Sequence, residues 1–156
     1  MNGNNPIAWT TADILEATAG QRVCGDLQHG FSKVFIDSRM PADDGVFVAI
    51  SGEIHDGHTF LPEVVERGGR GLVVKREKIE QLPLAAWKTR GVVCVAVADT
   101  TRALGDMAAF HRRRSRASVL GITGSNGKTT TRQFTASVVS QQYRTLATAG
   151  NFNNEI

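Results

Sequence analysis

Residues 121–131, with the sequence GITGSNGKTTT, place glycines, a lysine and hydroxyl side chains in an order that suits phosphate. Gly124 and Gly127 allow the backbone to turn tightly, so that several N–H groups can point at one anion. A helix that follows such a loop adds the positive end of its dipole. Lys128 would then reach the outer phosphates of a nucleotide, and the Thr129 hydroxyl would bind Mg²⁺.

The loop departs at one position from the strict pattern G-x-x-x-x-G-K-[ST]. That pattern requires glycine five positions before Gly127, where this chain has Ile122, and Gly121 comes one residue too early. The motif that remains is T-G-x-x-G-K-T-T, and the alternative interpretation is a glycine turn with a surface lysine. We favour a phosphate site. The predicted nucleotide-binding residues are Thr123, Gly124, Ser125, Asn126, Gly127, Lys128, Thr129 and Thr130.

The segments around the loop predict a strand, a helix and a second strand. Residues 117–123 are apolar and β-rich, as in a buried parallel strand. Residues 128–143 carry apolar side chains, among them Phe134 and Val138, at helical spacing. Residues 144–149 predict the second strand. The order is that of one β-α-β unit, which would have little cover as a two-stranded parallel sheet.

Earlier in the chain, apolar strands alternate with helices, which predicts an α/β fold. Strands are expected at residues 33–39, 45–50, 71–75 and 91–97. These segments are sufficient for a hydrophobic core of their own. We therefore expect two domains, residues 1–115 and residues 116–156, the second being the incomplete start of a P-loop ATPase domain.

Helices are expected between the strands of the first domain. Thr10 and Asp13 predict a capping box at the start of one helix, and Gly20 predicts its end. A second helix is expected within residues 59–69, and a third begins near Asp99. The third helix has four apolar residues available to pack, namely Leu104, Met107, Ala108 and Phe110.

The composition is that of a soluble globular protein, with 41% hydrophobic and 21% charged residues in a chain of 156. No apolar run approaches the ~20 residues that a membrane span needs. The N-terminus has no secretory signal, so a cytoplasmic protein without a membrane partner is expected. Cys24 and Cys94 form no C-x-x-C motif, and we expect reduced, buried thiols; a disulfide is the alternative.

The net charge of +3 comes largely from the run HRRRSR, residues 111–116. Because arginine clusters bind phosphate backbones, a basic nucleic-acid-binding module is an alternative function. The run also closes a predicted helix, where cations complement the negative C-terminal end. No aromatic residues interleave with the arginines, as a single-strand platform would need. We favour a solvated helix end and no nucleic-acid partner.

Three segments resemble the Mur ligases, which make the peptide stem of bacterial cell-wall precursors. Residues 37–74, DSRMPADDGVFVAISGEIHDGHTFLPEVVERGGRGLVV, resemble the N-terminal domain of that family. GITGSNGKTTT resembles the family's own ATP loop, which accounts for the missing early glycine. TAGNFNNEI, residues 148–156, contains G-N-x-N-N-E-I and resembles the MurF type. The alternative is the MurE type, which adds the third amino acid and usually has a Thr-rich segment there.

The resemblance implies an ATP-dependent amide-bond ligase of peptidoglycan precursor synthesis that uses Mg²⁺. Its substrates would be UDP-N-acetylmuramoyl-tripeptide and D-alanyl-D-alanine, joined through an acyl phosphate. Lys128 and Glu155 would be catalytic, with Thr129 and Glu155 at the metal. Asn153 and Asn154 would bind substrate. A solvent-facing acid at a strand end is the alternative for Glu155.

The resemblance also implies that the first domain holds the UDP part of the substrate. The matching positions are Asp37, Ser38, Arg39, His55, Asp56, Gly57 and His58. The Ser38 hydroxyl would hydrogen-bond uracil or ribose, and Arg39 would pair with the diphosphate. The alternative is that Asp37 and Arg39 cap and brace the loop after their strand. Two histidines without a carboxylate cluster are weak evidence for zinc, and we predict none.

The whole enzyme is expected to be a monomer, whereas the 156-residue chain alone is expected to be inactive. An ATP site in an open α/β sheet needs neighbouring strands and loops that these residues do not supply. An uncovered apolar face on the helix after the phosphate loop would favour self-association.

Overall fold

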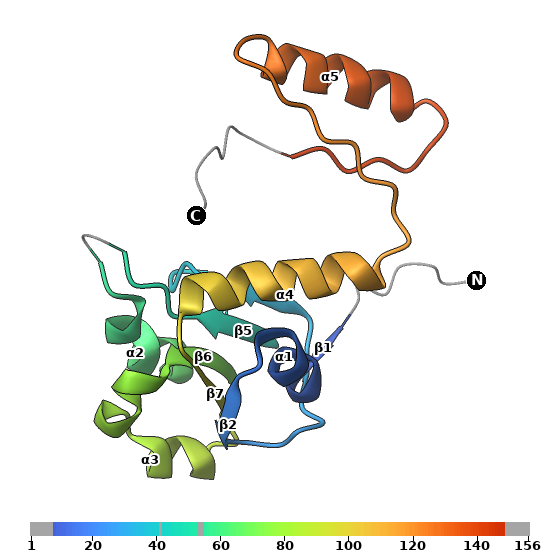
Figure 1. Ribbon diagram of the computed structural model, residues 1–156. Coiled ribbons are helices and arrows are strands. Elements are labelled where there is room, and N and C mark those ends of the chain that lie inside the picture. The colour runs from blue at the N-terminus through green and yellow to red at the C-terminus, as the bar shows by residue number, and fades with distance from the viewer. Residues whose placement is uncertain (1–7, 41, 53–54, 149–156) are drawn as a thin grey trace. The chain divides into compact units, whose positions relative to one another are not determined.

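The computed structural model describes residues 8–40, 42–52 and 55–148 (Figure 1). The chain has a mixed α/β fold, as predicted, and divides into two compact units, Met1–Ser115 and Arg116–Ile156. Among the described residues, the first unit contains every strand and the second contains a single helix.

The first unit is built on a five-stranded sheet with the order β2-β7-β6-β5-β4. Strands β4 to β7 pair in parallel, whereas β2 lies antiparallel to β7 at one edge. Parallel neighbours require crossover connections, so helices cover both faces of this sheet. The strands are β2 (Gln21–Cys24), β4 (Lys33–Phe35), β5 (Gly45–Val48), β6 (Gly71–Lys75) and β7 (Val93–Val97).

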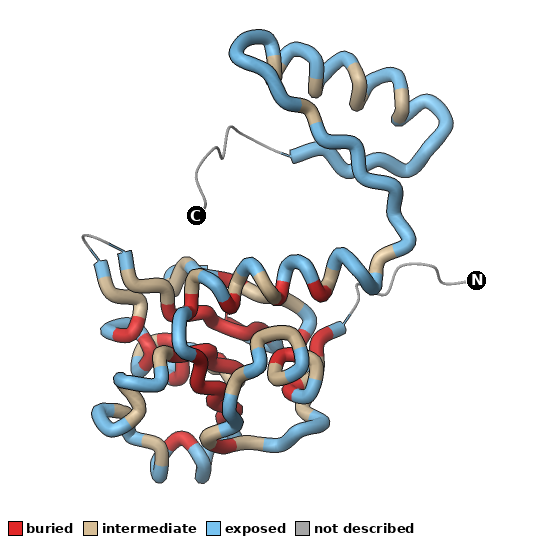
Figure 2. The backbone as a smooth tube through the Cα atoms, in the orientation of Figure 1, coloured by how far each residue is buried: buried red, intermediate tan, exposed pale blue. Residues whose placement is uncertain are grey.

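Alternating side chains of the central strands supply two hydrophobic cores, one on each face. Figure 2 shows the buried residues gathered within the first unit. Val73 and Val95 pack beneath helices α1 and α4, whereas Leu72 and Cys94 pack against α2 and α3. Because both faces are buried, these strands are continuous apolar runs. The helices are α1 (Thr11–Thr18), α2 (Leu61–Glu66), α3 (Leu84–Thr89) and α4 (Thr100–Arg114).

Helix α1 begins with the predicted capping box. Thr10 Oγ1 accepts from the Asp13 N–H at 3.1 Å, and the Asp13 carboxylate accepts from the Thr10 N–H at 2.8 Å. The predicted end was wrong by one residue, because Ala19 rather than Gly20 takes the left-handed conformation, at φ 49°. Gly20 is small for another reason: a Cβ there would lie 2.7 Å from Val95 Cγ1 in β7.

Helix α4 begins after Asp99, whose carboxylate accepts from the N–H groups of two residues in the first turn. Met107 and Phe110 are buried against the sheet, as predicted. Ala108 was predicted to pack but is exposed, while Leu104 is only partly buried. The packed stripe also contains Ala103, four residues before Met107, so the helix is rotated from the face that we expected.

Several short elements were not predicted from the sequence. Strand β1 (Trp9–Thr10) pairs with β3 (Gly30–Phe31) in a two-stranded antiparallel sheet. The 3₁₀ helices are η1 (Gly57–Phe60) and η2 (Arg76–Gln81). Strand β2 begins with the polar pair Gln21 and Arg22, and such a short edge strand lacks the apolar run that marks β5 to β7.

The two cysteines lie opposite each other on β2 and β7, and both are free and buried. The Cys24 thiol donates to the Val92 carbonyl at 3.3 Å. Burial raises the pKa of both thiols, that of Cys94 to about 12. They are therefore protonated, unreactive members of the core at neutral pH.

The second unit contains the predicted helix, α5 (Lys128–Val139), but not the predicted strands. Residues 117–123 and 144–148 form no strand, which corrects the expectation of a β-α-β unit. A strand exists only with a hydrogen-bonded neighbour, and no described residue supplies one to these segments. No residue from 116 to 148 is buried (Figure 2), and the large side chains exposed there include Val119, Leu120, Phe134, Val138, Tyr143 and Leu146.

A pair of glycine substitutions tests the packing of β2 on β7. Gly25 has φ +93°, and a Cβ there would lie 2.5 Å from Val93 Cα. Gly25→Ala should therefore destabilise the protein by about 2–5 kcal/mol, through left-handed strain and overpacking. Gly105 lies within α4, and a Cβ there would meet nothing within 4 Å, so Gly105→Ala should stabilise the protein by about 0.5–1 kcal/mol.

Urea unfolding of both variants measures these changes. Equal midpoints for the two variants would contradict the close approach of Gly25 to β7.

Candidate functional site

The carboxyl ends of four strands gather polar residues at one edge of the main sheet. Asp37 follows β4, Ser51 follows β5, Lys75 ends β6 and Asp99 follows β7. Because β4 to β7 run parallel, these positions share one edge. Ligands of open α/β sheets bind outside this edge, which makes it the candidate site of the first unit.

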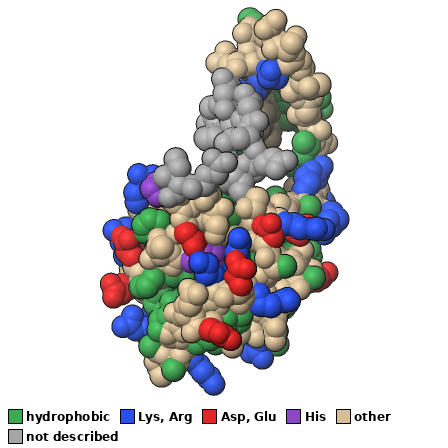
Figure 3. Space-filling model, turned by 60° about the vertical axis from the view of Figure 1, so that its left-hand side comes forward, with side chains coloured by type: hydrophobic (Ala, Val, Ile, Leu, Met, Phe, Trp, Pro, Cys, Tyr) green, Lys and Arg blue, Asp and Glu red, His purple; other side chains and the backbone are tan. Residues whose placement is uncertain are grey.

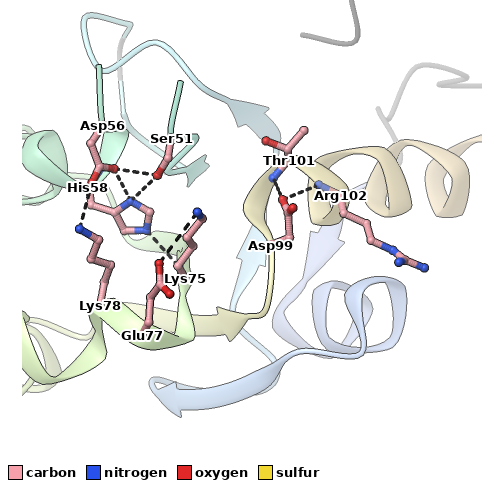
Figure 4. A network of polar contacts seen from close by, with 9 residues as sticks. All are labelled: Ser51, Asp56, His58, Lys75, Glu77, Lys78, Asp99, Thr101 and Arg102. Carbon is pink, nitrogen blue, oxygen red and sulfur yellow. Dashed lines mark hydrogen bonds and ion pairs between the residues drawn. The ribbon is translucent and has the colours of Figure 1, made fainter. Parts of the chain in front are cut away.

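The Asp56 carboxylate is the centre of the polar contacts at this edge (Figure 4). Its Oδ1 accepts from the His58 backbone N–H at 3.0 Å and from the Ser51 hydroxyl at 3.0 Å. Oδ1 also lies 2.6 Å from His58 Nδ1, and Oδ2 lies 3.3 Å from Lys78 Nζ. Burial acts to raise the pKa of Asp56, but hydrogen bonds from these residues together hold that pKa well below its ordinary value.

His58 has a defined tautomer because of its two ring contacts. Nε2 lies 2.9 Å from the Lys75 backbone nitrogen, which can only donate, so Nε2 is the acceptor. Nδ1 therefore carries the hydrogen and donates it to Asp56. The His58 side chain is 5% exposed. Both polar atoms of this ring are thus occupied inside the protein, and a substrate would have to displace one of these bonds to reach it.

The turn before His58 is folded tightly on the end of β5. Gly57 N–H donates to the Ile50 carbonyl at 2.8 Å, and Gly52 N–H donates to the His55 carbonyl at 2.8 Å. A Cβ on Gly57 would lie 2.8 Å from that Ile50 oxygen, so a larger residue would require the backbone to move. Gly57 thus has a packing role, while the neighbouring His55 is exposed.

The residues after β4 form a turn closed by an ion pair. Arg39 Nε and Nη2 donate to the two carboxylate oxygens of Asp37 at 2.9 and 2.7 Å. The same carboxylate accepts from the Arg39 N–H, and these bonds lower the pKa of Asp37 to about 2. The Arg39 side chain is 85% exposed, and Ser38 between the pair is half-buried. This geometry matches the bracing role, and it also leaves a guanidinium at the surface beside the sheet edge.

The ends of β6 and β7 carry charges of opposite sign. Lys75 Nζ lies 4.0 Å from Glu77 Oε1 (Figure 4). The Asp99 pKa is lowered, first by the backbone hydrogen bond from Arg102 and then by that from Thr101, with smaller contributions from the charges of Lys75 and Arg102. Asp99 is therefore ionised at neutral pH, and its carboxylate caps the start of α4.

The second unit presents the predicted phosphate loop, residues 121–128, as a turn that leads into α5 and contains no buried residue. Gly124 has φ +150° and Gly127 has φ +74°, values that favour glycine. Gly127 is the N-cap of α5, and no side chain caps this helix. Lys128 Nζ donates back across the loop to the Gly124 carbonyl at 2.6 Å. The helix start, the glycine turn and the lysine are thus adjacent in space.

Three sequence-predicted site residues, Asn153, Asn154 and Glu155, lie outside the described residues. Sequence reasoning missed Ser51, Lys75 and Lys78, which complete the contacts of Asp56 and His58. A signal for the first two existed, because both stand at the carboxyl end of an apolar strand. Lys78 carried no such signal.

The arginine run at the end of α4 makes contacts within the first unit. Arg114 Nη1 pairs with Asp13 Oδ1 at 3.1 Å, and the guanidinium groups of Arg113 and Arg114 lie over the Phe110 ring. On the face seen in Figure 3, basic and acidic side chains stand beside one another. Arg113 and Arg114 thus make contacts within the first unit, as expected for charged side chains at the end of a helix.

In the part of the chain that the structure describes, no group of three or more His, Cys, Asp or Glu side chains is placed to hold a metal ion. Among the same residues, no helix has the length and apolar character needed to cross a membrane.

Comparison with known sequences identifies relatives along most of the chain. Residues 122–156 match the model of the Mur ligase middle domain. The chain is 39% identical over 147 residues to the UDP-N-acetylmuramoyl-tripeptide–D-alanyl-D-alanine ligase of Treponema pallidum, covering 92% of this chain and 32% of that protein. It is 37% identical over 150 residues to the ligase of the same name from Escherichia coli, covering 96% and 30%. The chain thus spans about a third of the length of these relatives.

Comparison with solved structures finds relatives of the same type as the comparison with sequences. A structure of MurF from Acinetobacter baumannii matches with a TM-score of 0.81 and 32% identity, covering 97% of this chain and 32% of the other. A structure of UDP-N-acetylmuramoylalanyl-D-glutamyl-2,6-diaminopimelate–D-alanyl-D-alanyl ligase from the same organism matches with a TM-score of 0.81, 31% identity and coverages of 99% and 33%. Because sequence and fold agree over nearly the whole chain, it belongs to the Mur ligase family, among relatives of the MurF type.

Proposed function

We propose that this chain forms the UDP-binding and phosphate-binding parts of an ATP-dependent amide-bond ligase. The complete ligase would add D-alanyl-D-alanine to UDP-N-acetylmuramoyl-tripeptide in peptidoglycan precursor synthesis. The observation that supports this proposal is the identity of 37–39% to ligases of that name along most of the chain, together with a glycine turn that places Lys128 at the start of α5. A ligase that consumes ATP and acts on a UDP-linked substrate would need one site for each nucleotide.

Residues 1–115 would bind the UDP part of the substrate at the carboxyl edge of the main sheet. Ser38 and Arg39 are the proposed contacts, since a hydroxyl can bond uracil or ribose and a guanidinium can pair with diphosphate. The Asp37 carboxylate would hold Arg39 in place before substrate arrives, because the two form a two-pronged ion pair. The exposed His55 is a further candidate for substrate contact.

Residues 116–156 would contribute the phosphate end of an ATP site. The left-handed Gly127 and the start of α5, which has no side-chain cap, fit an anion. Lys128, held across the loop by Gly124, would turn its ammonium toward the phosphates. Thr129 and Glu155 would hold Mg²⁺, which supplies charge neutralisation at the transferring phosphate when bound. Asn153 and Asn154 would hydrogen-bond substrate.

The MurE type is the alternative within the family. A relative from Oceanobacillus iheyensis named UDP-N-acetylmuramyl-tripeptide synthetase 2 is 32% identical over 122 residues. We favour the MurF type, because this chain contains the segment G-N-x-N-N-E-I.

Phosphate release by a full-length ligase carrying this sequence should require D-alanyl-D-alanine and the UDP-tripeptide. Release with diaminopimelate or lysine and a UDP-dipeptide instead would identify the MurE type.

Lys128→Ala should abolish ligation in a full-length ligase that carries this sequence, because it removes charge from the phosphate site without emptying a core. The expected loss of kcat is about 100-fold or more, since charged contacts to a transferring phosphoryl group are among the largest catalytic contributions. Arg132→Ala, in the next turn of α5, is the matched control for a lost cation. Near-normal phosphate release by Lys128→Ala would contradict the assignment.

Arg39→Ala should weaken UDP binding to the chain by about 10–100-fold, the range expected for a lost charge-assisted hydrogen bond. Asp37→Ala frees the same guanidinium and should weaken binding less. Calorimetric titration with UDP measures both variants. Equal losses would favour bracing of the turn over direct contact by Arg39.

The 156-residue chain alone should self-associate through the exposed apolar side chains of its second unit. Phe134 and Val138 are 69% and 70% exposed, one helical turn apart on α5. Phe134→Ser combined with Val138→Ser should shift the mass measured by light scattering toward the monomer. A wild-type chain that is monomeric by light scattering would contradict self-association. Micromolar affinity for ATP would contradict the expectation that this chain lacks a complete ATP site.

A further inference from the structure

His58 lies in a turn for which the family resemblance implies substrate binding, yet its ring faces the protein. The residue is 8% exposed overall. One ring nitrogen donates to Asp56 and the other accepts from the Lys75 backbone (Figure 4). A side chain with both polar atoms engaged in this way cannot also bind a ligand without losing a bond. Its influence on a ligand must therefore pass through its partners.

The contact with Lys75 lies where the pairing between β5 and β6 stops. Ala49 N–H donates to the Val73 carbonyl at 3.0 Å, which is the last ladder bond from the β5 side. Strand β6 continues to Lys75, still paired with β7 on its other side. The Lys75 N–H donates to His58 Nε2 at 2.9 Å, in place of a carbonyl from a continuing β5. The ring thus completes the ladder where β5 turns away.

The contact with Asp56 links that ladder end to the charged groups at the sheet edge. Asp56 caps η1 through the His58 backbone, receives the Ser51 hydroxyl from the end of β5 and pairs with Lys78 of η2. The Lys78 and Asp56 side chains are 33% and 31% exposed, so this ion pair reaches solvent. One imidazole therefore connects the ends of β5 and β6 to a lysine and a carboxylate at the surface.

We infer that His58 is a positioning residue for nucleotide binding, which acts by holding the Asp56 turn and Lys78 against the ends of β5 and β6. This inference rests on the proposed UDP site at the carboxyl edge of the sheet. In the absence of the ring, the Lys75 N–H loses its partner and the Asp56 carboxylate loses one donor. The turn can then leave the sheet, and the ligand must order it on binding at a cost in affinity.

Two amide substitutions separate the two contacts of the ring. In His58→Asn the amide nitrogen takes the place of Nδ1 and keeps the bond to Asp56, but no atom reaches Lys75. In His58→Gln the amide oxygen takes the place of Nε2 and keeps the bond to Lys75. His58→Ala removes both bonds. His29→Asn is the matched control, because the His29 ring packs on Phe31 in the β3 region.

The test measures UDP affinity of the 156-residue chain by calorimetry, well below each variant's thermal midpoint. His58→Ala should raise Kd about tenfold or more, with smaller rises for the Asn and Gln variants and none for His29→Asn. The second readout is hydrogen exchange of the Lys75 amide, measured by NMR. Exchange should accelerate in the Ala and Asn variants and stay slow in Gln, a pattern that general destabilisation would not produce.

The outcomes distinguish the inference from the function on which it rests. A wild-type chain that binds no UDP would overturn the proposed site and the role of His58 together. Binding by the wild type, with folded Asn and Gln variants within about twofold of its Kd, would overturn the positioning role alone. If His58→Ala fails to fold, the Asn and Gln variants still decide the question.

Discussion

The parallel pairing of β4 to β7 is the constraint on which the rest of the first unit depends. Parallel strands bury both faces, so the chain must cross over each time with helices or turns. Every crossover leaves the sheet at its carboxyl edge, and the polar residues that begin each crossover therefore meet there. The same pairing that buries Val73 and Leu72 on opposite faces also brings Ser51, Lys75 and Asp99 to one edge.

Strand ends at that edge leave backbone groups that need partners, and side chains supply them. Asp99 accepts from the first N–H groups of α4, and Asp56 accepts from the turn of η1. His58 takes the Lys75 N–H that β5 no longer reaches. Hydrogen bonds to the two carboxylates lower the pKa of both, so both carry negative charge at neutral pH. At the same edge, Lys78 pairs with Asp56 and Lys75 lies near Glu77, so the charged side chains are held by one another.

Patterns that depend on neighbouring residues could be predicted from the sequence. The capping box of Thr10 and Asp13 is local, and so is the apolar run of β7, which explains why both predictions were confirmed. Patterns that depend on distant residues could not be predicted. Gly20 is small because Val95 lies beside it, and the role of His58 depends on Lys75, 17 positions away. The polar edge strand β2 carried too weak a pattern.

The prediction of strands at residues 117–123 and 144–148 was wrong for the same reason, because a strand depends on a distant partner. Their composition is that of buried strands, but composition specifies only a capacity to pair. Without a ladder partner among the described residues, Val119 and Leu120 stay exposed, while α5 forms because its hydrogen bonds are internal. The glycine loop likewise depends on local backbone, with Gly127 left-handed at the helix start. Thus the glycine turn and the helix start of the second unit form from local backbone, whereas the polar edge of the first unit requires the whole sheet.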